Sequence, residues 1–206
     1  LRLIAELSKD VAMVEAFQQG LDIHSATAAK VYGVPLEEVT PEQRRNAKTV
    51  NFSIIYGAGS LNLSRQLGIK RTEAKEIIES YFTQFNGLKS YMDRMVNEAH
   101  EFGYVTTLMG RRRYLRDINS RNSLARSGAE RIAVNSPIRG TAADMIKLAM
   151  IKIHEEFISK GVQSKMIMQV HDELVFDVLR TELEQVKEIV IRNMQNAIPG
   201  LAVPIE

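Results

Sequence analysis

Four side chains that could bind a nucleotide recur at intervals of four residues: Arg44, Lys48, Phe52 and Tyr56. A helix turns about 100° per residue, so this spacing places the four side chains as a stripe along one broad face, over about 18 Å. We call these four residues the stripe. Arginine and lysine suit phosphate oxygens, and the aromatic rings suit a sugar or a base. The two cations come first along the helix and the two aromatic residues follow. A nucleoside triphosphate has the same order of groups, with a polyanionic tail at one end and a flat base at the other. The pattern also fits an amphipathic helix with a solvated basic end and a core-facing aromatic end.

A second candidate site is the carboxylate pair Asp172 and Glu173, which lies between two strand-like runs at 166–170 and 174–178. A hairpin would hold both carboxylates at its tip. Hard cations such as Mg²⁺ prefer oxygen ligands and keep several waters and substrate phosphates. These residues are therefore candidates for a magnesium site, and by themselves they fit an ordinary exposed polar turn as well.

The elements that must position these groups are mostly helical, and we expect a predominantly helical α+β fold. Capping and turn signals, such as Thr40-Pro41-Glu42-Gln43 before the striped segment and Gly57 after it, mark where helices begin and end. The expected helices are 1–7, 11–18, 22–29, 41–57, 61–67, 71–82, 87–101, 122–159 with a jog at Pro137 or Gly140, and 181–197. The expected strands are 104–108, 112–115, 166–170, 174–178 and a third strand-like run at 201–206.

Composition narrows the function classes. The chain has 206 residues, 45% hydrophobic and 25% charged, which are ordinary globular values. The absence of cysteine excludes disulfides, zinc ribbons and thiol catalysis. No apolar run approaches the ~20 residues of a membrane span, and no signal peptide opens the chain. We therefore expect an intracellular protein with no membrane partner.

The positive charge is concentrated in one segment. Net charge is only +2, yet residues 111–131 hold seven arginines against two acidic residues, a local charge of +5. Such a segment indicates either a polyanion partner or a solvated arginine face.

Several motifs together resemble those of family A DNA polymerases, the bacterial DNA polymerase I type. Arg44–Gly57 is similar to the second motif of that family, and Gln169–Glu173 is similar to its third motif. Further matching blocks occur in the family's order and extend the resemblance over essentially the whole chain. These blocks are Asp22-Ile23-His24 with Thr27-Ala28, Thr107–Arg112 and Gly140–Asp144.

The resemblance implies a domain organisation. Residues 1–123 would form a helical fingers subdomain, with the nucleotide-binding helix at about 41–57. Residues 124–206 would form part of a palm with an antiparallel sheet, and its catalytic hairpin would lie at about 164–179. The thumb, the exonuclease domains and the extreme C-terminus are expected to be absent from this chain.

The resemblance also implies a role for each site residue. Arg44, Lys48 and His24 would contact the triphosphate, Phe52 would pack on the sugar and Tyr56 would lie at the insertion site. Lys48 would in addition donate a proton to the pyrophosphate leaving group.

The remaining site residues concern the metal ions and the DNA. Asp172 would ligate two magnesium ions with Glu173 in support, and His171 would lie near the primer terminus. Arg131 and Asn135 would contact the minor groove of the primer–template. The implied partners are primer–template DNA and deoxynucleoside triphosphates. The implied parent is a cytoplasmic, nucleoid-associated monomer in DNA replication and repair.

The chain departs from the family pattern at three places. Leu1-Arg2 resembles the end of the first motif, whose magnesium-binding Asp and whose Glu would fall upstream, so we expect the fragment alone to be inactive. Arg139 stands where the family usually has Gln. Arginine cannot accept a hydrogen bond, so the acceptor of that Gln is lost, and the guanidinium could contact a phosphate instead. Arg116 stands where Pro is common.

Two other function classes remain as alternatives. One is a non-catalytic helical module that binds nucleic acid, with salt-dependent DNA binding and no triphosphate selectivity. The other is a metal-dependent nucleotide hydrolase that uses the acidic hairpin. The intact stripe argues against the module, and the lack of a second His-Asp pair argues against the hydrolase.

Overall fold

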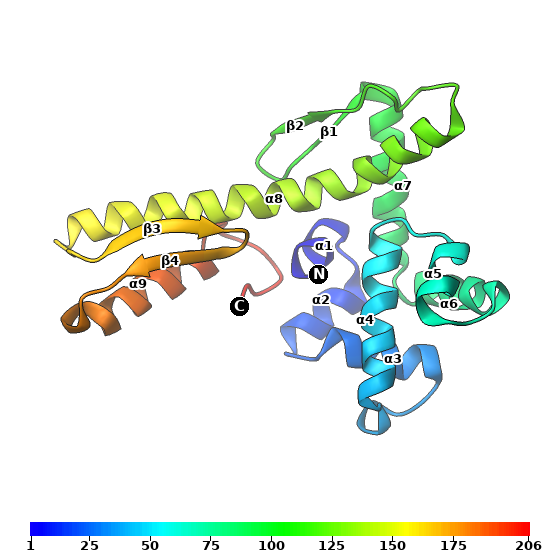
Figure 1. Ribbon diagram of the computed structural model, residues 1–206, viewed down its shortest axis with the longest axis horizontal. Helices are drawn as coiled ribbons and strands as arrows, with labels where there is room; N and C mark the ends of the chain where they lie inside the picture. The colour runs from blue at the N-terminus through cyan, green and yellow to red at the C-terminus, as the bar shows by residue number, and fades with distance from the viewer. The chain divides into compact units, whose positions relative to one another are not determined.

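The computed structural model describes residues 1–206, and the chain divides into two compact units. The first unit comprises Leu1–Gly140 and the second comprises Thr141–Glu206. The fold is predominantly helical with two small antiparallel sheets, which confirms the expected α+β class (Figure 1). None of the helices combines the length and the hydropathy that a transmembrane span needs.

The first unit is built from helices and one short hairpin. Its α-helices before the hairpin are α1 (Arg2–Ser8), α2 (Val11–Gln18), α3 (Ile23–Tyr32), α4 (Pro41–Ile55), α5 (Ser60–Leu67), α6 (Arg71–Gln84) and α7 (Asn86–Phe102), with a short 3-10 helix at Leu36–Glu38. Helix α3 packs along α4, and α5 packs on α6 (Figure 1). The helix that carries the stripe is in contact with both α3 and α5.

The hairpin of the first unit joins α7 to the long helix α8. Strands β1 (Tyr104–Thr106) and β2 (Arg112–Tyr114) pair antiparallel, with Tyr104 opposite Tyr114. Val105 points inward and is 2% exposed, in a cluster with side chains of α7, the following turn and α8. This cluster comprises Ala99, Val105, Leu115, Ile118, Ala129 and Ala133. It fixes the start of α8 against the rest of the unit.

Helix α8 (Ser123–Ser159) continues through Pro137 and Gly140 as one uninterrupted helix. The division between the two compact units falls within it, after Gly140. Proline inside a helix removes one backbone hydrogen bond, so its tolerance here indicates that packing around the buried Pro137 compensates.

The second unit is a hairpin packed with two helical segments. Strands β3 (Lys165–Val170) and β4 (Glu173–Asp177) pair antiparallel, with a register shift between Met166 and Met168. A 3-10 turn (Arg180–Glu182) leads into α9 (Leu183–Gln195). The C-terminal half of α8, strand β4 and α9 share one apolar cluster, in which the rings of Phe157 and Phe176 lie 6.1 Å apart. This apolar cluster therefore supports the hairpin that carries the acidic tip.

One sequence expectation is wrong: residues 201–206 form no strand. Pro204 has no N–H to donate to a ladder, and Val203 is buried at 1% exposure. The apolar residues that suggested a strand therefore reflect side-chain burial in an irregular segment.

Candidate functional site

Helix α4 presents the stripe on its outer face, as the spacing predicts. Arg44, Lys48 and Tyr56 are exposed and Phe52 is half-buried. The opposite face of the helix is buried by Ala47, Val50, Asn51, Ser53, Ile54 and Ile55. The two cations and the two aromatic rings are therefore available to a ligand along a single face.

Local sequence fixes where α4 begins. The hydroxyl of Thr40 accepts from the Gln43 backbone N–H at 3.2 Å, and the Thr40 N–H donates to Gln43 Oε1 at 2.9 Å. This capping box, with Pro41 at the first helical position, satisfies backbone donors that a helix start otherwise leaves free.

Arg44 is already paired in the structure. Its Nε donates to Asp22, the residue that caps α3 and also accepts from Ser25 Oγ at 3.0 Å. Partial burial pushes the pKa of Asp22 up, but hydrogen bonds from Arg44, Ser25 and the His24 backbone outweigh it and hold the pKa below its usual value. A phosphate group that binds Arg44 would share the guanidinium with this carboxylate or displace it.

His24 lies beside the stripe at the start of α3. Its ring centroid is 5.9 Å from that of Phe52, and its Nδ1 is 3.0 Å from Asn51 Nδ2. Burial, together with the charges of Arg44 and Lys48, keeps the pKa of His24 below its usual value despite the opposing effect of Asp22. The ring is therefore predominantly neutral near pH 7.

The aromatic end of the stripe borders a cavity. The rings of Phe52 and Tyr56 lie 6.2 Å apart and nearly parallel, at 16°. The adjoining cavity has a volume of about 590 Å³. It is lined by Phe52, Ser53, Tyr56, Gly57, Ala58, Gly59, Asn62, Gln66 and Arg131. Its flat aromatic wall and polar rim suit a planar, hydrogen-bonding group such as a base.

Helix α8 brings three predicted DNA contacts to this end of α4. Arg131, Asn135 and Arg139 are spaced by four residues, so they share one helix face. The guanidinium of Arg139 lies 5.0 Å above the Tyr56 ring, a cation–π distance. The side chain of Arg131 passes so close to Gly57 that a Cβ there would lie 2.8 Å from its Cγ. Asn135 Nδ2 donates to the Arg131 carbonyl at 2.8 Å, while its buried Oδ1 accepts no hydrogen bond.

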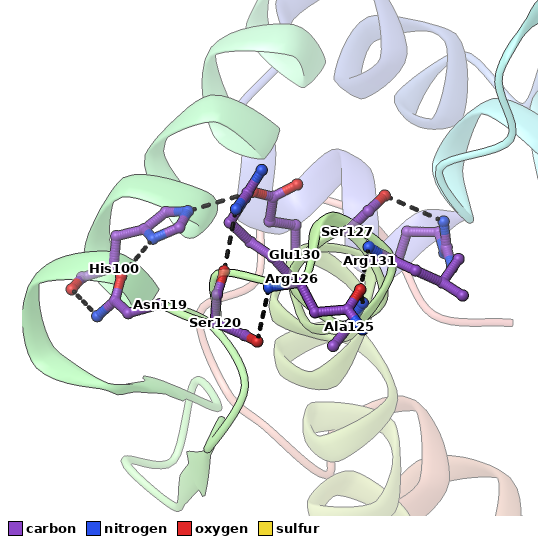
Figure 2. Close-up of polar contacts among 10 residues, drawn as sticks. His100, Asn119, Ser120, Ala125, Arg126, Ser127, Glu130 and Arg131 are labelled. Atoms are coloured by element: carbon purple, nitrogen blue, oxygen red, sulfur yellow. Dashed lines mark hydrogen bonds and ion pairs between the residues drawn. The ribbon is translucent and has the colours of Figure 1, made fainter.

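A polar network anchors the first turns of α8, as Figure 2 shows. His100 Nδ1 contacts Asn119 Oδ1 at 2.8 Å, and His100 Nε2 contacts Glu130 at 3.3 Å. Arg126 donates to the Ser120 carbonyl at 3.0 Å and lies 3.9 Å from Glu130. Arg126 is therefore one of several arginines between 111 and 131 that make contacts within the protein, and Arg116 sits in an exposed turn that forms without proline.

The acidic hairpin tip belongs to the second unit. His171 has a left-handed φ of 54°, which non-glycine residues rarely adopt, and its carbonyl accepts from Gln169 Nε2 at 2.8 Å. His171, Asp172 and Glu173 are all exposed. The donor type fits a hard cation such as Mg²⁺, because carboxylate oxygens are its usual protein ligands. No group of three or more His, Asp or Glu side chains that could hold a metal ion gathers in the structure.

The structure therefore brings His24, the α4 stripe and the α8 arginines together in the first unit, and describes the hairpin tip separately in the second. The expected fingers–palm boundary after residue 123 stays a prediction, since the compact units divide at Gly140. Sequence reasoning missed Asp22 as a partner of Arg44 and missed Asn51 altogether. A polar Asn on the apolar face of a predicted helix was the signal that could have drawn attention to it.

Comparison with known proteins gives consistent matches. A family model described as DNA polymerase family A matches residues 1–206. The DNA polymerase I of Streptococcus pneumoniae (strain TIGR4) is 50% identical over 206 residues, which are 100% of this chain and 23% of that protein. The DNA polymerase I of Geobacillus stearothermophilus is 47% identical over the same share of each chain. This chain spans about a quarter of the length of these curated relatives.

Among solved structures, the chain is similar to the POL domain of Pol1 from M. smegmatis, a complex with DNA primer-template and dNTP. The TM-score is 0.95 at 43% sequence identity, and the match covers 100% of this chain and 36% of that one.

Proposed function

Because this chain belongs to DNA polymerase family A, we propose that it supplies the nucleotide-binding helix and part of the catalytic site of a DNA-directed DNA polymerase. In this proposal residues 1–123 are the fingers and residues 124–206 are part of the palm. The activity is addition of deoxynucleotides to a primer 3′ end, in DNA replication and repair. The relative of known structure was solved with DNA primer-template and dNTP, which supports the same two partners here.

The observation that carries the proposal is the stripe of α4 with its neighbours. Arg44 and Lys48 are exposed, His24 flanks them, and the Phe52–Tyr56 pair borders a cavity of about 590 Å³. We assign Arg44, Lys48 and His24 to the triphosphate, Phe52 to the sugar and Tyr56 to the insertion site. Fixed cations stabilise the charge that develops during phosphoryl transfer, and they act most strongly where water is excluded.

In this proposal Lys48 is the residue that transfers a proton to the leaving group. Its ammonium group lies on the exposed face one turn after Arg44, where it can donate a proton to the pyrophosphate leaving group. Arg44 cannot take this role, because a guanidinium stays protonated at any physiological pH. The role of Arg44 is therefore to orient the phosphates.

The catalytic metal ions fall to the hairpin tip. Asp172 would bind two magnesium ions with Glu173 in support, and the ions would supply Lewis-acid stabilisation of the phosphate oxygens. His171, the neighbouring residue of the tight turn, is assigned to the primer terminus. This assignment is supported by the exposure of both carboxylates and by the preference of Mg²⁺ for oxygen ligands.

The DNA contacts fall to α8. Arg131, Asn135 and Arg139 share a face, and two of them touch the Tyr56–Gly57 segment. Polar groups that contact the minor groove can test base-pair geometry without reading sequence, since the hydrogen-bond code of that groove is degenerate. Arg139 adds a second positive charge to this face.

A template-dependence experiment in the full-length protein that contains this chain tests the proposal. We expect incorporation of the deoxynucleotide that complements the template, lost in Asp172→Asn. A nucleic-acid-binding module would bind DNA without triphosphate selectivity, and a hydrolase would release phosphate from free nucleotide without template. Either of these results, with no template-directed incorporation by the wild type, would overturn the assignment.

A further inference from the structure

Asn51 is a fully buried polar residue on the inner face of α4, with 0% exposure. Its amide lies between two side chains of α3, Thr27 and His24. A buried amide must find partners, because an unsatisfied buried polar group costs about 1–3 kcal/mol. The directions of its hydrogen bonds can be worked out from what its neighbours are able to donate.

Thr27 contacts both ends of the amide. Its hydroxyl has a single proton, and Thr27 Oγ1 lies 2.8 Å from the carbonyl of Ile23, 3.2 Å from Asn51 Oδ1 and 3.1 Å from Asn51 Nδ2. Because the Ile23 carbonyl can only accept and is the nearest partner, Thr27 Oγ1 is free to accept from Asn51 Nδ2. In this orientation of the amide, Nδ2 also faces the ring of His24.

The second proton of the amide then determines the tautomer of His24. Asn51 Nδ2 lies 3.0 Å from His24 Nδ1, so Nδ1 must accept. A neutral imidazole with Nδ1 as acceptor carries its proton on Nε2. No protein atom accepts from Nε2 in the structure, so this N–H is available to a ligand.

Burial is the largest influence on the charge of His24, and it favours the neutral ring. Asp22 would stabilise an imidazolium, whereas Arg44, Lys48 and the amino group of Leu1 oppose it. The pKa of His24 is accordingly held below its usual value. The ring can thus act as a neutral donor without first taking up a proton.

We propose that Asn51 is a positioning residue that locks His24 in the Nε2–H tautomer, so that the neutral ring donates a hydrogen bond to a phosphate oxygen of the incoming triphosphate. This role rests on the proposed function, because it needs a triphosphate along the stripe. It explains why a polar residue occupies a fully buried position on the apolar face of α4. In this proposal Arg44 and Lys48 contribute positive charge to the triphosphate site, and His24 contributes a directional hydrogen bond to one phosphate oxygen.

The first experiment needs no enzymatic activity. Long-range ¹H–¹⁵N NMR of the histidine rings in this chain reports which ring nitrogen carries the proton. We expect Nε2–H for His24 in the wild type, and a change of tautomer or an imidazolium in Asn51→Asp, whose carboxylate can only accept. Asn46→Asp is the matched control on the same helix, where Asn46 donates to Tyr32 Oη at 3.1 Å. An Nδ1–H tautomer in the wild type would overturn the proposal.

The second experiment measures the KM for deoxynucleotide against pH in the full-length enzyme, between about pH 6 and about pH 8, a range that brackets the usual histidine pKa. We expect little pH dependence in the wild type. Asn51→Asp should raise KM about tenfold at the alkaline end and less at the acid end, where a charged ring still donates. The catalytic rate should change less than KM.

A second variant, which keeps Asn51, controls for the possibility that Asn51→Asp misfolds. Thr27→Val removes the anchor of the amide at nearly constant volume, and we expect a mixed His24 tautomer with a smaller rise in KM. If the tautomer is confirmed but KM is unchanged in both variants at every pH, the proposed donation is wrong. If the wild type shows no template-directed incorporation, the proposed function fails while the NMR result still decides the tautomer.

Discussion

Gly57 is the residue at which the chain leaves the aromatic end of α4 and turns toward α5. Its φ is +76°, and an added Cβ would lie 2.8 Å from Arg131 Cγ. We predict that Gly57→Ala lowers the free energy of unfolding by more than the ~1–2 kcal/mol that a left-handed alanine alone costs. The extra cost arises because the Arg131 side chain must move. Denaturant unfolding of the chain measures it.

Gly68 provides the matched control for this prediction. It ends α5 with a φ of +68°, and an added Cβ there would meet nothing within 4 Å. Gly68→Ala should therefore show the backbone cost alone. Equal losses in the two variants would mean that the contact with Arg131 does not constrain Gly57.

Lys48 is the stripe residue to which we assign proton transfer. In the full-length enzyme, Lys48→Ala should lower the rate of the chemical step by about 10²–10³-fold, a magnitude seen when one group that stabilises developing charge is removed. Nucleotide affinity should fall less, because Arg44 and His24 remain. Single-turnover incorporation over a range of nucleotide concentrations separates the two effects.

Arg45 is the control for Lys48, since it is an exposed cation of the same helix that lies off the stripe. Arg45→Ala should leave the rate of the chemical step nearly unchanged. A loss of affinity that exceeds the loss of rate in Lys48→Ala would show that Lys48 binds the triphosphate without acting in the chemical step.

At the scale of elements, one carboxylate joins the two helices of the second unit. Glu156 of α8 accepts from Lys160 at 2.7 Å, from Asn193 of α9 at 2.8 Å and from Arg192 of α9. The hydrogen bond from Arg192, followed by those from Lys160 and Asn193, lowers the pKa of Glu156 to about 2. The same helices supply the apolar cluster beneath the hairpin.

This depressed pKa predicts how the stability of the second unit depends on pH. A carboxyl with a lower pKa in the folded state contributes stability above its unfolded value of about 4.3, and that contribution is lost as pH falls toward about 2. Glu156→Gln should therefore destabilise the chain near pH 7 and converge with the wild type in acid. Urea midpoints across this range measure it. Glu155→Gln, at a neighbouring side chain without an ion pair, should show no such convergence.

The elements also show how far local sequence signals extend. The ends of α2 and α5 match the expectation closely, because caps and glycines act within one turn. The predicted jog in α8 and the third strand at 201–206 depended on tertiary packing instead. A buried proline can be tolerated inside a long packed helix, and an apolar run needs a paired neighbour to become a strand.

At the scale of the whole molecule, we expect the number of carboxylates to limit what the chain can do by itself. A two-metal site needs carboxylates on both sides of two ions about 3.5–4 Å apart. The structure gathers no group of three or more possible ligands. We therefore predict that the purified chain of 206 residues does not extend a primer on its own.

A gel-based extension assay with a labelled primer–template measures this, with Asp172→Asn prepared in parallel. Extension of equal strength in both samples would indicate host polymerase carried through purification. Template-directed extension by the wild type that disappears in Asp172→Asn would contradict the prediction and would show that the chain holds a complete catalytic site.

The sequence by itself determined the striped helix, its capping box, the acidic hairpin, the concentration of arginines and the family, because these depend on residues near one another in the chain or on motif order. Only the tertiary structure showed that Asp22 pairs with Arg44, that Asn51 contacts His24 and that Arg139 lies over Tyr56. These contacts join residues that are 22, 27 and 83 positions apart. Their geometry depends on how α3, α4 and α8 pack, which no local spacing specifies.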